Sequence, residues 1–170
     1  MNYKWIGAIL IVVACGGFGF SLAAMHLREE RELRRLIGAL DFMECELQYR
    51  LTPLPELCRL AGNEGKGCVR DVFLRLAEEL DAQVTPDVES CMRASVSAAS
   101  DIPVCTREAL LNLGQTLGRF DLPGQLKGLE SVRTACRQRL GELTQNKEPR
   151  LRSYQTLGIC AGAALAILFM

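Results

Sequence analysis

Two long segments without a charged residue occupy the two ends of this chain, at residues 5–25 and 153–170. The hydrocarbon core of a membrane is about 30 Å thick, and about 20 residues of helix cross it. Tyr3 and Trp5 lie at the outer end of the first segment and Tyr154 at the start of the second. Aromatic rings at such positions are typical of the membrane interface. The pattern therefore predicts two transmembrane helices.

The chain is divided accordingly into an N-terminal transmembrane helix (1–26), a central domain (27–152) and a C-terminal transmembrane helix (153–170). The 170 residues include 20 Lys+Arg and 20 Asp+Glu, and all of these except Lys4 lie in the central domain. Because basic and acidic side chains are almost equal in number, the domain lacks the basic surface that nucleic-acid binding needs. We expect no nucleic-acid partner.

Basic side chains gather at the inner ends of the two predicted spans. Those that follow the first span or precede the second are Arg28, Arg31, Arg34, Arg35, Lys147, Arg150 and Arg152. The outer ends offer only Lys4. Loops rich in Lys and Arg stay on the cytoplasmic side of a membrane. The central domain is therefore predicted to be cytoplasmic, with both termini on the other side.

A cleaved signal peptide is an alternative interpretation of the first apolar segment. Residues 12–15 resemble a bacterial lipoprotein cleavage box, with Cys15 as the residue that would be acylated. The apolar run continues to Met25, however, and Lys4 is the only basic residue before it. A membrane lipoprotein with an extracytoplasmic helical interaction domain thus stays as the alternative.

Apolar residues recur at helical spacing along the central domain. A first stripe has 3-4-3-4 spacing and consists of Leu33, Leu36, Leu40, Met43 and Leu47. A second stripe, near the far end of the domain, consists of Leu126, Leu129, Val132, Cys136, Leu140 and Leu143. Such spacing is typical of amphipathic helices. Nothing breaks the chain before the first stripe, so a single helix is predicted over about residues 3–50. The two stripes indicate an antiparallel, coiled-coil-like pair of long helices.

Shorter helices are predicted between these two. They are expected from about Glu56 to Leu60, through Val69–Leu80, from Asp87 to about Ser97, and from a cap at Thr106 through Leu117, with a flexible turn at 62–67. Asp121 followed by Pro123 predicts the start of the last long helix. No segment alternates with the period of a strand, so the predicted fold class is all-α: a membrane-anchored helical bundle.

Residues able to carry chemistry are few. His26 is the only histidine, at the edge of the first span, where an interfacial role is expected rather than catalysis or metal binding. The eight cysteines include no Cys-x-x-Cys pair, and Cys45, Cys58 and Cys136 fall at apolar-stripe positions, as buried thiols do. The Gly65-Lys66-Gly67 sequence lacks the spacing of a phosphate-binding loop. We expect no enzyme activity, no metal and no cofactor, with a thiol-based membrane sensor as a further alternative.

Two glycines, Gly114 and Gly118, are four residues apart in the helix predicted to follow Thr106. A glycine inside a helix costs about 1 kcal/mol relative to alanine. The usual compensation is the close approach of another helix. Both glycines are therefore predicted to lie on one packed helix face, with two tolerated or helix-terminal glycines as the alternative.

Three segments together carry a resemblance to a known family. They are Leu-Asp-Phe-Met-Glu-Cys-Glu-Leu-Gln-Tyr at 40–49, Thr-Pro-Leu-Pro-Glu at 52–56 and Leu-Gly-Gln-Thr-Leu-Gly-Arg-Phe-Asp at 113–121, with Gln125 and Lys127 beyond. With a span at each end, the chain resembles the stage III sporulation protein AB family of endospore-forming bacteria over essentially its full length.

The resemblance implies a membrane component of the assembly that joins mother cell and forespore, located on the mother-cell side in the outer forespore membrane. Its domain would be similar to the cytoplasmic domain of the platform protein in type II secretion and type IV pilus systems. Expected partners are the AA-type secretion ATPase, other subunits of the sporulation complex and, in a homo-oligomer, further copies of the chain. The residues expected to shape the bundle or its docking surface are Thr52, Pro53, Pro55, Glu56, Gly114, Gly118, Asp121, Gln125 and Lys127.

Overall fold

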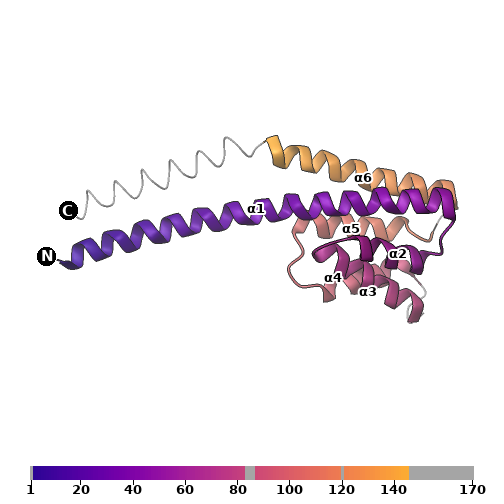
Figure 1. Cartoon of the computed structure of the whole chain (residues 1–170), viewed down its shortest axis with the longest axis horizontal. Coiled ribbons are helices and arrows are strands. Elements are labelled where there is room, and N and C mark those ends of the chain that lie inside the picture. Colours follow the sequence, from indigo (N-terminus) through magenta and orange to yellow (C-terminus); the bar gives the residue numbers. More distant parts are fainter. Residues whose placement is uncertain (1, 83–86, 120, 146–170) are drawn as a thin grey trace. The chain divides into compact units, whose positions relative to one another are not determined.

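The computed structural model describes residues 2–82, 87–119 and 121–145. These residues form six helices and, within those ranges, no strand, which confirms the all-α prediction (Figure 1). The helices are α1 (Asn2–Arg50), α2 (Leu54–Glu64), α3 (Cys68–Ala82), α4 (Val88–Ala98), α5 (Val104–Thr116) and α6 (Leu122–Gln145).

The chain divides into two compact units. One consists of Met1–Arg28 with Glu142–Met170, and the other, which holds the helical bundle, of Glu29–Gly141. In the part of the chain that the structure describes, no helix is both long enough and apolar enough to span a membrane. The predicted span at 153–170 lies outside the described residues.

The single helix predicted over about residues 3–50 is confirmed as α1. Its apolar stripe, Leu33, Leu36, Leu40, Met43 and Leu47, is buried as the core of the bundle. Cys45 was predicted to join this stripe, but it is exposed. It lies two residues from Met43, about half a turn around the helix, and so points away from the core. Cys58 and Cys136 are buried as predicted.

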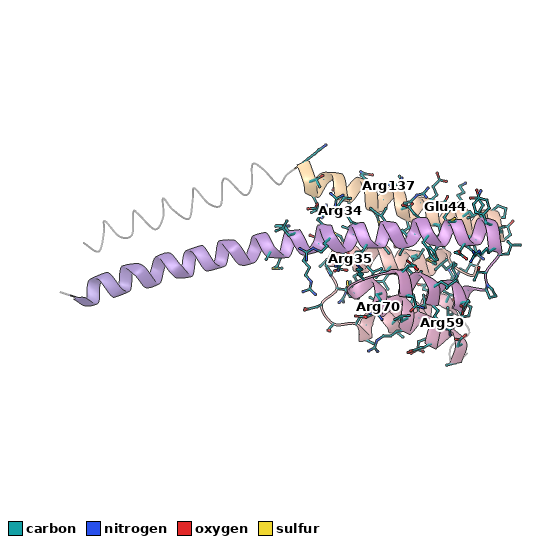
Figure 2. The ribbon with its side chains drawn as sticks, in the orientation of Figure 1. Arg34, Arg35, Glu44, Arg59, Arg70 and Arg137 are labelled. Carbon is teal, nitrogen blue, oxygen red and sulfur yellow. The ribbon has the colours of Figure 1, made fainter. Side chains whose placement is uncertain are left out.

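Helices α1 and α6 form the predicted antiparallel pair. Leu129, Val132 and Cys136 of α6 are buried. Arg133 of α6 contacts two carboxylates of α1, Asp41 at 3.1 Å and Glu44. Arg137, one turn further along α6, reaches Asp41 at 3.4 Å, and Glu44 and Arg137 lie along the seam between the two helices (Figure 2).

Successive helices run in alternating directions through the bundle. The turn between α2 and α3 lies beside the start of the buried stripe of α1, because Gly67 lies against Glu32 and Arg35. At the opposite end, Gly118 after α5 lies against Leu54, the first residue of α2, and Val88, the first of α4. We call this opposite end the tip; it comprises the described residues 49–56, 87–89, 117–119 and 121–128.

The predicted flexible turn at 62–67 is shorter than expected. Helix α2 continues to Glu64, so Gly62 is a buried helical residue. A Cβ on Gly62 would lie 2.8 Å from Leu74 Cγ of α3, so the missing side chain lets the two helices approach closely. The turn itself is restricted to 65–67, where Gly67 has a φ of 70°.

The predicted cap at Thr106 is wrong. Helix α5 begins at Val104 and its N-cap is Pro103, whose carbonyl oxygen accepts a hydrogen bond from the Arg107 amide at 2.9 Å. Thr106 is therefore inside the helix, and it is buried. The predicted and observed N-caps are three residues apart, which is less than one helical turn.

Candidate functional site

The two segments predicted to matter most, 52–56 and 114–127, meet at the tip. A Cβ placed on Gly118 would lie 3.4 Å from Leu54 Cδ2 and 2.7 Å from Val88 Cγ2. The turn between α1 and α2, the start of α4 and the turn between α5 and α6 thus converge on one glycine. The resemblance named these segments separately; the fold joins them into one surface.

Gly118 does not share a helix face with Gly114, contrary to the prediction. Helix α5 ends at Thr116, and Gly118 follows in the turn with a φ of 74°. That left-handed conformation is cheap only for glycine, which commonly ends helices in this way. Glycine is thus favoured over other residues at position 118 for two reasons: the left-handed backbone and the short distance to Val88, which leaves no space for a Cβ.

Gly114 lies inside α5 and is buried, as predicted. A Cβ on Gly114 would be 2.7 Å from Met92 Cβ and 3.6 Å from Glu89 Cα. Real Cβ atoms do not approach one another so closely, so Gly114 sets the separation of α4 and α5. The cost of a glycine within a helix is offset here by helix packing.

Residues 52–56 build the turn that leads from α1 into α2. The Thr52 hydroxyl donates to Glu46 Oε2 at 3.3 Å, and the Pro53 carbonyl oxygen accepts from the Leu57 amide at 2.9 Å. Pro55 occupies the first turn of α2, where a proline loses no helical hydrogen bond. Glu56 forms an ion pair with Arg59, which also contacts Asp81 of α3.

Asp121 caps α6 as predicted. Its Oδ1 accepts a hydrogen bond from the Gly124 amide at 3.2 Å, and its carbonyl oxygen accepts from the Gln125 amide at 2.9 Å. Gln125 is half-buried, whereas Lys127 is exposed. Of the nine predicted residues, most thus serve turns, caps and packing, and Lys127 points to solvent.

Several residues that stabilise the tip were not predicted from the sequence. Gly128 of α6 packs on α5, since its Cβ would lie 2.7 Å from Thr116 Cβ. Arg119 extends from the α5–α6 turn to Glu89 at 3.3 Å and to Asp87 at 3.9 Å. Spacing within one helix cannot reveal such contacts, because each depends on a residue of another helix.

Among the described residues of the tip, Tyr49 and Leu51 are the large apolar residues that are exposed. Their exposed fractions are 78% and 67%. Leu51 also has a φ of 52°, in the left-handed region. The other residues with positive φ in the described part of the chain are Asp101, Gly67 and Gly118. Glycine and aspartate tolerate this region, whereas a leucine there is strained.

Three of the thiols are poorly suited to nucleophilic chemistry because their pKa values are raised. Burial raises the pKa of Cys58 to about 12 and that of Cys136 to about 11, the latter with a smaller contribution from Cys105. Burial and a hydrogen bond with Glu29 also raise the pKa of Cys105. Thiols with raised pKa values stay protonated near neutral pH and are poor nucleophiles. Within the described ranges, moreover, no three His, Cys, Asp or Glu side chains are grouped as metal ligands would be.

The bundle therefore defines an α-helical domain in which the motif residues are used for packing and capping around an exposed tip. The chain belongs to the stage III sporulation protein AB family, whose pattern it matches over residues 4–170. It is 26% identical to stage III sporulation protein AB of Bacillus subtilis (strain 168), over 98% of this chain and 99% of that protein.

A solved structure of a stage III sporulation protein AB has the same fold. It superimposes with a TM-score of 0.62 at 23% identity, covering 71% of this chain and 96% of the other. The chain is accordingly a sporulation protein by family.

Proposed function

We propose that this protein is a non-enzymatic membrane platform of the sporulation-specific, secretion-like complex between mother cell and forespore. Its two apolar ends would anchor it in the outer forespore membrane. The bundle would then lie in the mother-cell cytoplasm, where it docks the AA-type secretion ATPase and gathers other subunits of the complex.

This proposal rests on the structural roles of the motif residues. Gly114, Gly118, Asp121 and the 52–56 turn all stabilise helix ends or close helix contacts. None of these residues aligns a nucleophile with a base or gathers ligands for an ion. The motif residues shape one end of the bundle and form no catalytic arrangement. This use favours a protein that binds other proteins over an enzyme that converts a substrate.

The charge pattern supports the proposed orientation. The basic residues Arg28, Arg31, Arg34 and Arg35 follow the first apolar segment, and Lys147, Arg150 and Arg152 precede the second. Positive charge at these places keeps a domain on the cytoplasmic side. A cytoplasmic ATPase can reach only a domain on that side.

The proposal is tested by following the ATPase in sporulating cells. A fluorescent fusion of the ATPase is imaged in cells with and without this protein, and in cells that make it without its two apolar ends. We expect the ATPase at the forespore membrane only when the full chain is present. An ATPase that stays at the membrane when the protein is absent would contradict the docking role.

A further inference from the structure

The end of the bundle opposite the tip gathers around the first turns of α1 that belong to the bundle. The α2–α3 turn lies there, because Gly67 lies against Glu32. The start of α5 lies there too: the Cys105 thiol is hydrogen-bonded with Glu29 and accepts a hydrogen bond from Arg139 Nε of α6 at 3.2 Å. We call this end the base; it comprises residues 29–35, 64–71, 98–108 and 137–141.

The base begins a short way along α1 from the end of the N-terminal apolar segment. That uncharged segment ends at Met25, and α1 continues without interruption to Glu29 and beyond. The four residues from Met25 to Glu29 correspond to about 6 Å of helix, at 1.5 Å per residue. The headgroup layer on each side of a bilayer is about 5–7 Å thick, half the difference between a membrane of about 40–45 Å and its hydrocarbon core of about 30 Å. With the segment in a membrane, Glu29 is therefore at the level of the headgroups.

Val104 is an exposed apolar residue at this same level. It is the first residue of α5 and directly precedes Cys105, which is hydrogen-bonded with Glu29. Its side chain is 67% exposed, so the core gains little from it. A single exposed apolar residue is common on protein surfaces and needs no explanation by itself. At the level of the headgroups, however, such a side chain can leave water for lipid, which is favourable.

The charged residues of the base are of both signs in almost equal numbers. They are Arg31, Arg34, Arg35, Lys66, Arg70, Arg107, Arg137 and Arg139 against Glu29, Glu30, Glu32, Glu64, Asp71, Asp101 and Glu108. Some neutralise one another within the base, as Arg34 does with Glu30 at 3.0 Å and Arg35 with Glu32. Recognition of anionic lipids needs clusters of basic residues, which this surface lacks. Charges of both signs match zwitterionic headgroups, which present a phosphate and an ammonium group together.

We infer that the base of the bundle is a membrane-contacting surface, which lies in a layer of zwitterionic headgroups with the Val104 side chain in contact with lipid. The start of α5 is its deepest part, since Cys105 is at the level of Glu29. The α2–α3 turn is at the level of Glu32, about 4.5 Å further along α1. This inference rests on the proposed function, which anchors the chain through its apolar ends but assigns the bundle itself no contact with lipid.

Tryptophan fluorescence can measure this contact, because Trp5 is the only tryptophan of the chain. In a Trp5→Phe background, Val104→Trp places the reporter at the base and Tyr49→Trp places it at the tip. These side chains are 67% and 78% exposed, so neither substitution disturbs the core. The preference of the indole ring for membrane interfaces acts equally on both chains, so the tip variant controls for it. Ser100→Trp, exposed in the connector before α5, supplies a second position at the base.

The full-length chains are reconstituted into vesicles of phosphatidylcholine and phosphatidylethanolamine that contain a lipid with a nitroxide quencher on its headgroup. We expect the quencher to lower the fluorescence of the Val104→Trp and Ser100→Trp chains at least about twofold. The Tyr49→Trp chain should keep its fluorescence within about a tenth, because Tyr49 is about 30 Å beyond Glu29 along α1. Replacing part of the phosphatidylcholine by anionic phosphatidylglycerol should change none of these values, because the base lacks a basic cluster.

The possible outcomes separate the inference from the proposed function. No quenching in either base variant, with Trp5 of the natural chain quenched, would overturn the contact of the base with lipid and leave the membrane anchor intact. A Trp5 that is not quenched in the natural chain would overturn the anchor and this inference with it. Equal quenching of the Tyr49→Trp chain would mean that the bundle lies lengthwise on the membrane, and quenching at the base only with phosphatidylglycerol would mean attraction to anionic lipid; either result overturns the contact inferred for the base.

Discussion

The side chain of Val88 occupies the space that a Cβ on Gly118 would need: the two would be only 2.7 Å apart. Val88 begins α4 and Gly118 follows α5, so this contact closes the tip where α4 starts and α5 ends. Leu54 of α2 completes it from the third side. The motif residues thus act mainly by holding together three helix ends that are distant in the sequence.

Gly118→Ala should destabilise the bundle by about 2 kcal/mol or more. The left-handed backbone costs a residue other than glycine about 1–2 kcal/mol, and the contact with Val88 adds to this. Urea unfolding of the full chain in micelles, followed by circular dichroism, measures the change. Gly38→Ala is the control, because nothing lies within 4 Å of a Cβ there and the site is inside α1. That variant should gain about 0.5–1 kcal/mol.

Gly114→Ala should also destabilise, but for a different reason. Its backbone is helical, so alanine by itself would be favourable, and only the approach to Met92 Cβ at 2.7 Å opposes it. A Met92→Gly substitution removes that Cβ, so Gly114→Ala should cost less stability in the Met92→Gly background than in the natural chain. No such rescue is expected for Gly118→Ala, where the backbone strain persists. Stabilities of the single and double variants test this; simple addition of the two losses would refute the close-approach account.

Replacement of Arg133 by methionine should cost about 0.5–1 kcal/mol and loosen α6 from α1. The Arg133 side chain is mostly buried and forms ion pairs with both Asp41 and Glu44. Asp41 is exposed to solvent, however, which limits the contribution of these ion pairs to stability. A double-mutant cycle with Glu44→Gln should show coupling that shrinks in high salt. Arg107→Met is the comparison, since Arg107 is exposed and forms no ion pair with any described residue. An equal loss of stability in both variants would mean that the contacts of Arg133 with Asp41 and Glu44 contribute nothing.

Stability should fall as the pH rises above 9. The pKa of Cys58 is raised by burial to about 12, against 9.0 for an ordinary thiol, so between these values the unfolded chain loses a proton that the folded chain keeps. Proton loss favours the unfolded state there, by about 1 kcal/mol per pH unit for one such thiol. Below pH 9 the thiol is protonated in both states and the effect vanishes.

Cys58→Ala should flatten this decline between pH 9 and 11, whatever it does to stability at neutral pH. Cys45→Ala should leave the slope unchanged, because Cys45 is exposed. Melting temperatures across that pH range supply the test. A slope that is the same in all three chains would show that the buried thiol does not drive the alkaline loss.

Periodicity predicted the parts of the fold that depend on one helix at a time. The stripe from Leu33 to Leu47 is regular over two heptads, so both α1 and its buried face could be predicted. The start of α6 followed from Asp121, whose side chain caps the helix locally. Such features need no knowledge of the neighbouring helices.

The errors have a common physical origin in contacts and backbone states that spacing does not encode. A glycine four residues after another can continue a helix or end it, and Gly118 ends it with a φ of 74°. Gly62 resembled a turn residue but is buried against Leu74. The strain at Leu51 could not be predicted at all, since nothing in its type suggests a left-handed backbone.

The central claim, a domain on the cytoplasmic side of a membrane, is tested most directly by labelling Cys45. This residue is exposed on α1, whereas Cys68 donates a hydrogen bond to the buried Glu32 at 3.2 Å and is a poorer reporter. A chain with Cys45 as its only cysteine is treated with a membrane-impermeant maleimide in intact and in lysed cells. The account predicts labelling only after lysis. Labelling of intact cells would place the bundle outside, remove the ATPase as a partner and favour a lipoprotein acylated at Cys15, which a chain retaining that cysteine would then reveal by mass spectrometry.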